Sequence, residues 1–319
     1  MSLTRIDVHA HFLPDFYREA MTAAGIDHPD GMPAIPSWSE QAALDVMDRL
    51  NIATAMLSIS SPGVNFGDDE AAKVLARQVN EEGTRLKQAH GKRFGLFAAT
   101  PLPDIAAAAR EAVFALDELK AEGIAIETSY RGMYLGDPRL EALYAALNDR
   151  DAVLFLHPTT GPCPELAFGL PRPALEFMFE TTRTVIYMIV SGVTQRYPNI
   201  RIIVPHAGAA LPVIASRVEF LLPLLTGATN THAPSIQAEL KRLYYDLAGA
   251  PLPVLLSALL QVASPDNILY GSDWPFTNNA ACLHLASQLD QHPEVQSEYA
   301  VKFMRANAQR LWPDLCRQE

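Results

Sequence analysis

The stretch IDVHAH, residues 6–11, places two histidines one residue apart at the end of a short apolar run. Successive side chains of a strand point to opposite faces, so His9 and His11 point the same way. Two imidazoles that share a face can converge on one metal ion. An isolated His-x-His pair can also be a surface coincidence or half of a hydrogen-bonded turn. The rest of the chain must therefore supply the remaining ligands.

Beyond this stretch, predicted strands alternate with predicted helices. Most of the strands are short apolar runs, which is typical of a parallel sheet buried on both faces. Eight βα units in 319 residues predict an α/β fold of the (β/α)8 TIM barrel type, formed by one domain over residues 1–319. The alternative is a doubly wound open sheet, but no glycine-rich phosphate-binding motif follows the first strand. The predicted strands cover residues 6–11, 52–60, 93–98, 123–128, 152–157, 200–206, 243–247 and 267–271.

Two long loops interrupt the alternation, at about residues 12–37 and 158–171. Loops of this length inside a compact domain usually serve as lids or binding loops. Polar residues that cap helices stand before several of the helical patterns. We expect one helix to begin after Ser37 or Ser39, a second at Asp68 and a third after Asp104.

The composition excludes several classes of protein. The net charge is −11 and lysine and arginine do not cluster, which argues against nucleic-acid binding and against a membrane-surface helix. The apolar stretches are shorter than the ~20 residues that a membrane span needs. Cys163, Cys282 and Cys316 lie far apart, so we expect neither a disulfide framework nor a thiolate zinc site. A cytoplasmic protein is the expectation that follows.

Polar residues gather at the predicted strand ends, where barrel enzymes carry their active sites. His9 and His11 end the first strand, His157 ends the fifth, His206 ends the sixth, and Asp273 follows the eighth. Each has an ordinary alternative, such as a hydrogen bond to a loop or a helix cap. Together at one rim they predict a site for one divalent metal ion such as zinc or manganese, with positions left for water or substrate.

Other polar residues near the same rim are weaker candidates. Asp246 ends the seventh strand and could orient an imidazole, and Glu127 near the end of the fourth strand could do the same. Either could also be a structural hydrogen bond of the rim. Tyr130 and Arg131 follow the fourth strand and could contact a substrate carboxylate or phenolate, although a solvated loop arginine is the alternative.

The motifs at these strand ends resemble the amidohydrolase superfamily. They are HAH at residues 9–11, HP at 157–158, HAG at 206–208 and GSDWPF at 271–276. More closely they resemble its amidohydrolase-related branch, which includes aminocarboxymuconate semialdehyde decarboxylase, γ-resorcylate decarboxylase and 5-carboxyvanillate decarboxylase. The stretches SISSPGV at 58–64 and YLGDP at 134–138 look like 6-methylsalicylate-type decarboxylases. The resemblance covers nearly the whole chain.

This resemblance implies a ligand set. His9, His11, His157 and Asp273 would bind one divalent metal, and His206 would sit beside it and contact water or substrate. Binuclear members carry a carboxylated lysine at the end of the fourth strand, whereas residues 123–128 here contain no lysine. The departure favours one metal and weakens the case for a binuclear hydrolase.

The activity implied is the non-oxidative decarboxylation of a small aromatic, hydroxybenzoate-like acid. Asp273 would deliver a proton to the ring carbon that bears the carboxylate, and His206 would polarise the substrate or take a proton. Trp274, Phe276 and the long loop after His11 could form apolar walls around the ring. The alternative is a hydrolase of an amide, ester or lactone that uses metal-activated water, and a barrel that binds metal without turnover is a third reading.

The resemblance also implies a homodimer. Apolar helix stretches at residues 177–179 and 187–190 are consistent with an interface, although they could equally belong to the core.

Overall fold

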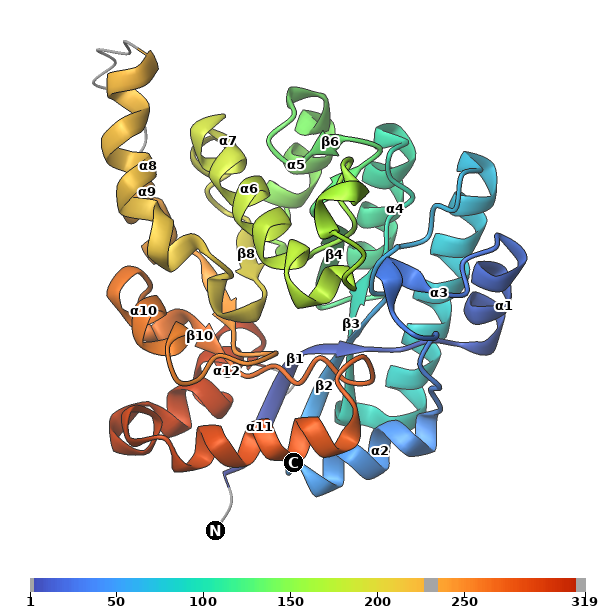
Figure 1. Ribbon diagram of the computed structural model, residues 1–319. Helices are drawn as coiled ribbons and strands as arrows, with labels where there is room; N and C mark the ends of the chain where they lie inside the picture. Colours follow the sequence, from blue (N-terminus) through green and yellow to red (C-terminus); the bar gives the residue numbers. More distant parts are fainter. Residues whose placement is uncertain (1–2, 227–234, 314–319) are drawn as a thin grey trace.

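Eight parallel strands form the centre of the computed structural model, which describes residues 3–226 and 235–313 (Figure 1). Their order in the sheet follows the chain, as a (β/α)8 barrel requires, and all eight occur where the sequence predicts them. The strands are β1 (Arg5–His11), β2 (Ile52–Ser58), β3 (Phe94–Ala98), β4 (Gly123–Glu127), β7 (Val153–His157), β8 (Arg201–Val204), β9 (Tyr244–Asp246) and β10 (Ile268–Leu269).

The sheet closes between its first and last strands. The backbone N–H of Val8 donates to the carbonyl of Tyr270 at 3.0 Å, and that of His11 donates to the carbonyl of Trp274 at 2.8 Å. Both acceptors lie in the segment after β10, so this segment completes the barrel. A side chain at Gly271 would not fit there, because an added Cβ would lie 2.8 Å from the Cβ of His9.

Helices surround the strands on the outside (Figure 1). Three of them begin at the caps that the sequence predicts, because the side chains of Ser39, Asp68 and Asp104 accept backbone N–H groups of the first turn. The helices are α1 (Asp15–Ala23), α2 (Glu40–Arg49), α3 (Asp69–His90), α4 (Ile105–Asp117), α5 (Glu141–Asn148), α6 (Glu176–Val190), α7 (Val193–Arg196), α8 (Leu211–Thr226), α9 (Ile236–Arg242), α10 (Leu255–Val262), α11 (Asn279–Gln291) and α12 (Asn307–Leu311).

Apolar side chains form two cores, one inside the barrel and one between the strands and the helices. The C-terminal segment closes the inner core, where Trp312 packs at a ring-centroid distance of 5.7 Å from Phe97. Trp312 covers the end of the barrel opposite the predicted site. The apolar side chains of the inner core fill the space between the two ends, so the interior is packed and is not a channel. The inner core comprises Ile6, Val8, Met56, Phe97, Ala125, Val153, Phe155, Ile203, Leu269, Ala308, Leu311 and Trp312.

The structure differs from the sequence prediction in three segments. Residues 12–37 were expected to be a loop, but they contain α1 and a short helical turn, Pro29–Gly31. Residues 158–171 contain another short turn, Pro164–Ala167. After β4 the chain forms a hairpin of β5 (Ser129–Tyr130) and β6 (Met133–Tyr134), which the sequence analysis missed. The turns and the hairpin strands are only two to four residues long, so they carry little hydrophobic periodicity. α1 is longer and amphipathic, with Tyr17 and Met21 buried four residues apart, so its pattern was a usable signal. Cys316 lies outside the described residues.

Among the described residues, no helix combines the length and the apolar composition needed to cross a lipid bilayer.

Asn80 joins three elements near the rim of the barrel. This buried side chain on α3 donates to the carbonyl of Ala99 at 3.0 Å, accepts from the N–H of Ala99 at 2.8 Å, and donates to Glu111 on α4 at 2.9 Å. It therefore supplies both hydrogen bonds of the first residue after β3.

We expect Asn80→Ala to lower the free energy of unfolding by about 2–3 kcal/mol, because it leaves buried backbone groups without partners. Urea unfolding followed by circular dichroism measures the loss. Gln78→Ala, an exposed position on the same helix, is the control and should change stability by less than about 0.5 kcal/mol. Equal midpoints for the two variants would contradict this role for Asn80.

Candidate metal centre

Five of the residues predicted to form a site meet at the C-terminal end of the barrel. His9 and His11 end β1 and His157 ends β7, while His206 follows β8 and Asp273 follows β10. The ring centroids of His9 and His11 lie 4.9 Å apart, as do those of His11 and His157, and His206 lies 5.1 Å from His9. The parallel barrel thus gathers residues from across the whole sequence at one point.

Four of these residues have the spacing of a metal site. One potential ligand atom from each of His9, His11, His157 and Asp273 lies within 4.8 Å of the other three. Asp273 Oδ1 is 3.4 Å from His9 Nε2 and 3.3 Å from His11 Nε2. Two ligands bound to one tetrahedral ion would lie roughly 3.4 Å apart. The four residues could therefore hold one ion.

Hydrogen bonds orient the two imidazoles of β1. The Nδ1 atom of His9 lies 2.9 Å from Asp246 Oδ2, and that of His11 lies 2.9 Å from Ser58 Oγ. The Ser58 hydroxyl donates to the carbonyl of Ala10, so its oxygen accepts from His11. Both histidines therefore carry their proton on Nδ1. Their Nε2 atoms are buried, have no hydrogen-bond partner and face the centre, where a metal ion would take the place of any proton on Nε2.

His157 has the same orientation. Its Nδ1 atom donates to the carbonyl of Pro158 at 2.7 Å, which leaves Nε2 to face the site, 3.3 Å from the hydroxyl of Ser60. Glu127 lies behind the ring, with Oε2 3.6 Å from His157 Nδ1. Burial lowers the pKa of His157 well below its usual value, so the ring is neutral, as a metal ligand must be.

Asp246 connects two of the histidines. One carboxylate oxygen contacts His9, and the other accepts the backbone N–H groups of His206 at 3.1 Å and Ala248 at 2.9 Å. Burial lowers the pKa of His9, but Asp246 and the second nearby carboxylate, Asp273, together raise it to about 10. Asp246 lies where the sequence analysis placed it, at the end of the seventh barrel strand.

Asp273 is held as an anion in an uncommon backbone conformation. Burial by itself raises its pKa, but the imidazoles of His11, His206 and His9 that face the carboxylate hold that pKa well below its usual range. Its φ is 59° and that of His206 is 54°, both in the left-handed region. Such conformations cost about 1–3 kcal/mol for a residue other than glycine, and they cluster at functional sites.

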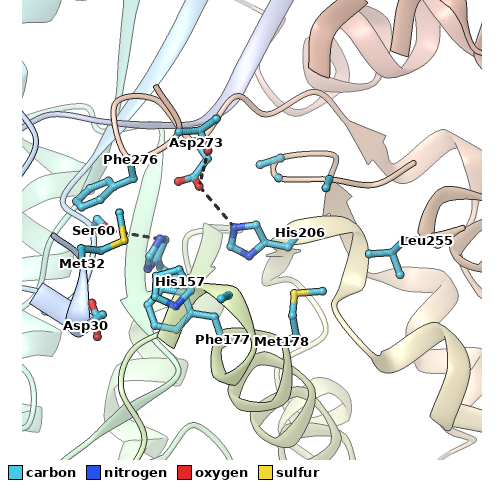
Figure 2. A pocket seen from close by; sticks show the side chains of 16 residues that line it. Asp30, Met32, Ser60, His157, Phe177, Met178, His206, Leu255, Asp273 and Phe276 are labelled. Carbon is cyan, nitrogen blue, oxygen red and sulfur yellow. Dashed lines mark hydrogen bonds and ion pairs between the residues drawn. The ribbon is translucent and has the colours of Figure 1, made fainter. Parts of the chain in front are cut away.

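A cavity of about 490 Å³ opens beside the cluster and is lined by His157, His206 and Asp273 (Figure 2). Its size suits a small ring. Phe276 lies in its wall, as the sequence predicts, but several lining residues come from positions that the sequence analysis did not select. The latter are Asp30, Met32, Ser60, Pro173, Ala174, Phe177, Met178, Ala248, Gly249, Ala250, Leu255 and Thr277.

The other three candidates for substrate contact lie elsewhere. Tyr130 and Arg131 line a second cavity of about 440 Å³, together with Glu127. The hydroxyl of Tyr130 accepts the backbone N–H of Glu127, and Arg131 pairs with Asp69 at 3.0 Å. Trp274 is buried, and its indole donates to a neighbouring asparagine side chain. The structure does not bring these three side chains to the cavity of the metal centre.

Sequence reasoning missed two hydroxyl partners of the histidines, Ser58 and Ser60, and an acid in the cavity wall, Asp30. The two serines lie in the last three residues of the strand predicted over residues 52–60, so their position at the rim was a usable signal. The segment that contains Asp30 was expected to be a binding loop, and it does reach the cavity, but no pattern within it distinguishes Asp30 from its neighbours.

Comparison with known proteins agrees with this architecture. The sequence profile of the amidohydrolase family matches residues 6–313. A 6-methylsalicylic acid decarboxylase of Penicillium expansum is 33% identical over 318 residues, which cover 98% of this chain and 97% of that protein. The match spans all the elements that contribute to the cluster.

Solved structures show the same fold. A crystal structure described as an amidohydrolase II superposes with a TM-score of 0.91 at 34% identity and covers 97% of this chain and 99% of its own. A dihydroxybenzoic acid decarboxylase of Polaromonas, solved with bound manganese and 2-nitroresorcinol, superposes with a TM-score of 0.83 at 24% identity and covers 99% and 98% of the two chains. From the family profile and these full-length matches, the chain belongs to the amidohydrolase family.

Proposed function

We propose that His9, His11, His157 and Asp273 bind one divalent metal ion, zinc or manganese, and that His206 stands beside it without binding. The support is that the buried, unpartnered Nε2 atoms of His9 and His11 converge with a ligand atom of His157 and a carboxylate oxygen of Asp273 at metal-ligand spacing. Neutral imidazoles and a carboxylate suit several first-row ions, so the donor set alone does not choose between zinc and manganese.

We further propose that the protein decarboxylates a small hydroxybenzoate-like acid without an oxidant. The observation that carries this proposal is the pairing of the His/Asp cluster with a mostly apolar cavity, in a chain one-third identical to a 6-methylsalicylic acid decarboxylase over its full length. Bound metal would supply a Lewis acid that holds the carboxylate and an adjacent phenolic oxygen. The apolar wall, which includes Phe276 and Phe177, would hold the flat ring and exclude water.

In this proposal Asp273 moves the proton. Because its pKa is held low, Asp273 is ionised at rest and must first take a proton, which an ortho-phenol of the substrate can provide. It then protonates the ring carbon that bears the carboxylate. The bond from that carbon to the carboxylate breaks, carbon dioxide leaves, and the electron pair restores the aromatic ring. His206, 4.0 Å from Asp273 Oδ2, would polarise the phenolate or the carboxylate.

The alternative from the sequence, a hydrolase of an amide, ester or lactone, would use the same cluster with a water nucleophile. The two are distinguished by product. Release of carbon dioxide from a hydroxybenzoate supports the proposed decarboxylase, whereas cleavage of an amide, ester or lactone with no carbon dioxide release would replace it.

We also propose a homodimer in the cytoplasm, as the sequence analysis expects. Three apolar residues of α6 support an interface, because Phe179, Tyr187 and Val190 are 45%, 40% and 38% exposed. Their neighbours Phe177 and Met188 are buried, so the predicted apolar stretches divide between core and surface.

The dimer proposal predicts a mass near twice 34.9 kDa in light scattering at micromolar concentration. Tyr187→Glu should shift the mass toward the monomer, because it places a charge in the interface. Val74→Glu, on the exposed face of α3, is the control and should leave the dimer intact. A clean monomer for the unchanged protein would contradict the proposal.

We expect His157→Ala to lose both bound metal and activity, because one of four ligands is removed. Plasma emission spectroscopy of the purified protein measures metal content, and carbon dioxide release measures activity. Chelation should abolish turnover in the unchanged protein, and added zinc or manganese should restore it. His284→Ala, an exposed histidine on α11, serves as control. Full metal content in His157→Ala would refute its assignment as a ligand.

Asp273→Asn should retain part of the metal but lose at least about 100-fold in kcat per bound ion, because an amide cannot pass a proton to the ring. Activity divided by metal content separates this loss from the loss of a ligand. A variant that works at the full rate per ion would rule out Asp273 as the proton donor.

A further inference from the structure

An acidic side chain, Asp30, lies in the wall of the cavity but outside the metal cluster. It belongs to the turn Pro29–Gly31 in the segment between β1 and α2, with a left-handed φ of 54°. Figure 2 shows Asp30 at the lower left of the cavity, below Met32, and Asp273 at the top. Asp30 is therefore placed to meet a part of the ligand that does not touch the cluster.

The carboxyl group of Asp30 is held in place by the loop after β7. Its Oδ1 atom accepts from the backbone N–H of Thr160 at 3.1 Å and from the Thr160 hydroxyl at 2.6 Å. The Ser61 hydroxyl, which lies 2.7 Å from the Thr159 hydroxyl, is also close enough to lower the pKa of Asp30. Both hydrogen bonds from Thr160 end on Oδ1, which leaves Oδ2 as the oxygen that can accept from a ligand.

The surroundings of Asp30 in the cavity are largely apolar. Met32, Phe276 and Phe177 are among its neighbours in the lining, and the described lining residues include no lysine or arginine. Burial raises the pKa of Asp30, whereas the hydrogen bonds from Thr160 and the nearby charge of Arg172 favour its ionised form. An aromatic acid would enter with its carboxylate toward the cluster, where a metal ion would bind it, and with its ring substituents toward Asp30. A ring substituent that donates a hydrogen bond would pair with the free oxygen of Asp30, whereas an apolar substituent would leave that oxygen without a hydrogen bond.

We propose that Asp30 determines substrate specificity by accepting a hydrogen bond from a second ring hydroxyl of the hydroxybenzoate. This inference rests on the proposed decarboxylase function and names the substrate class more narrowly. The two hydrogen bonds from Thr160 fix the position of the acceptor, so little side-chain freedom is lost when the hydroxyl binds. A site built to bond a substrate hydroxyl discriminates strongly against an analogue that lacks it.

The test uses matched substrates on the metal-loaded enzyme. The 2,3-, 2,4-, 2,5- and 2,6-dihydroxybenzoates are each compared with the 2-hydroxybenzoate that carries a methyl group at the same second position. Hydroxyl and methyl are close in size, so the ratio of kcat/KM within a pair reports hydrogen bonding at that position. We expect the hydroxyl compound to be favoured by about 10-fold or more in at least one pair.

Asp30→Asn is the central variant. Thr160 donates to an oxygen, so the amide oxygen of the introduced side chain should take that place and its NH2 group should replace Oδ2, which removes the charged acceptor. We expect the favoured ratio to fall below about 3, whatever happens to the absolute rates. Asp30→Ala should lower it as well. Asp27→Asn, an exposed acid on the same segment, should leave the ratio unchanged.

Two results would overturn the inference. One is a preference for methyl at every position in the unchanged enzyme. The other is a hydroxyl-to-methyl ratio of kcat/KM that Asp30→Asn leaves unchanged. In that case the variant lowers kcat/KM equally for both members of each pair, or for neither, and Asp30 only anchors its loop. If no acid is decarboxylated, the proposed function fails, and calorimetric dissociation constants for the same pairs then decide the role of Asp30 by the same ratios.

Discussion

The backbone hydrogen bond from the N–H of Asp273 to the carbonyl of His9, 2.7 Å long, joins the two ends of the barrel at the site itself. It belongs to the same set of bonds that closes β1 against the segment after β10. Closure of the sheet and assembly of the cluster are therefore one event. Gly271 permits the approach, because any side chain there would collide with His9. A chain that failed to close would separate the carboxylate from all three imidazoles.

Around this junction, each imidazole is oriented by a different partner: a carboxylate for His9, a hydroxyl for His11 and a backbone carbonyl for His157. The three partners all engage Nδ1 and so direct every Nε2 to the centre. The negative charge of Asp246 also makes His9 the most basic of the three. The three imidazoles thus share one orientation but differ in pKa. Asp246 also accepts a hydrogen bond from the backbone N–H of His206.

The cavity divides into two chemically distinct parts. One side carries the His/Asp cluster, and the other is formed by apolar side chains with Asp30 as an acid held by Thr160. The lining combines residues from the β1–α2 segment, from α6 and from the turns after β8, β9 and β10. In barrels of this kind the catalytic residues lie at the ends of the strands, and the loops determine which substrate fits.

The sequence by itself determined the eight strands, three helix caps and the cluster of four histidines and one aspartate at the strand ends. Each depends on a local pattern: apolar runs, a capping residue, or a polar residue directly after a strand. Only the tertiary structure decided which other residues line the cavity beside the cluster and Phe276. Asp30 and Met32 reach it from a segment that folds back over the rim, whereas Tyr130 and Arg131, which follow a strand closely, turn with a hairpin toward a second cavity. The path of the segment between β1 and α2 depends on contacts with distant residues such as Thr160. The sequence of the segment alone does not predict those contacts.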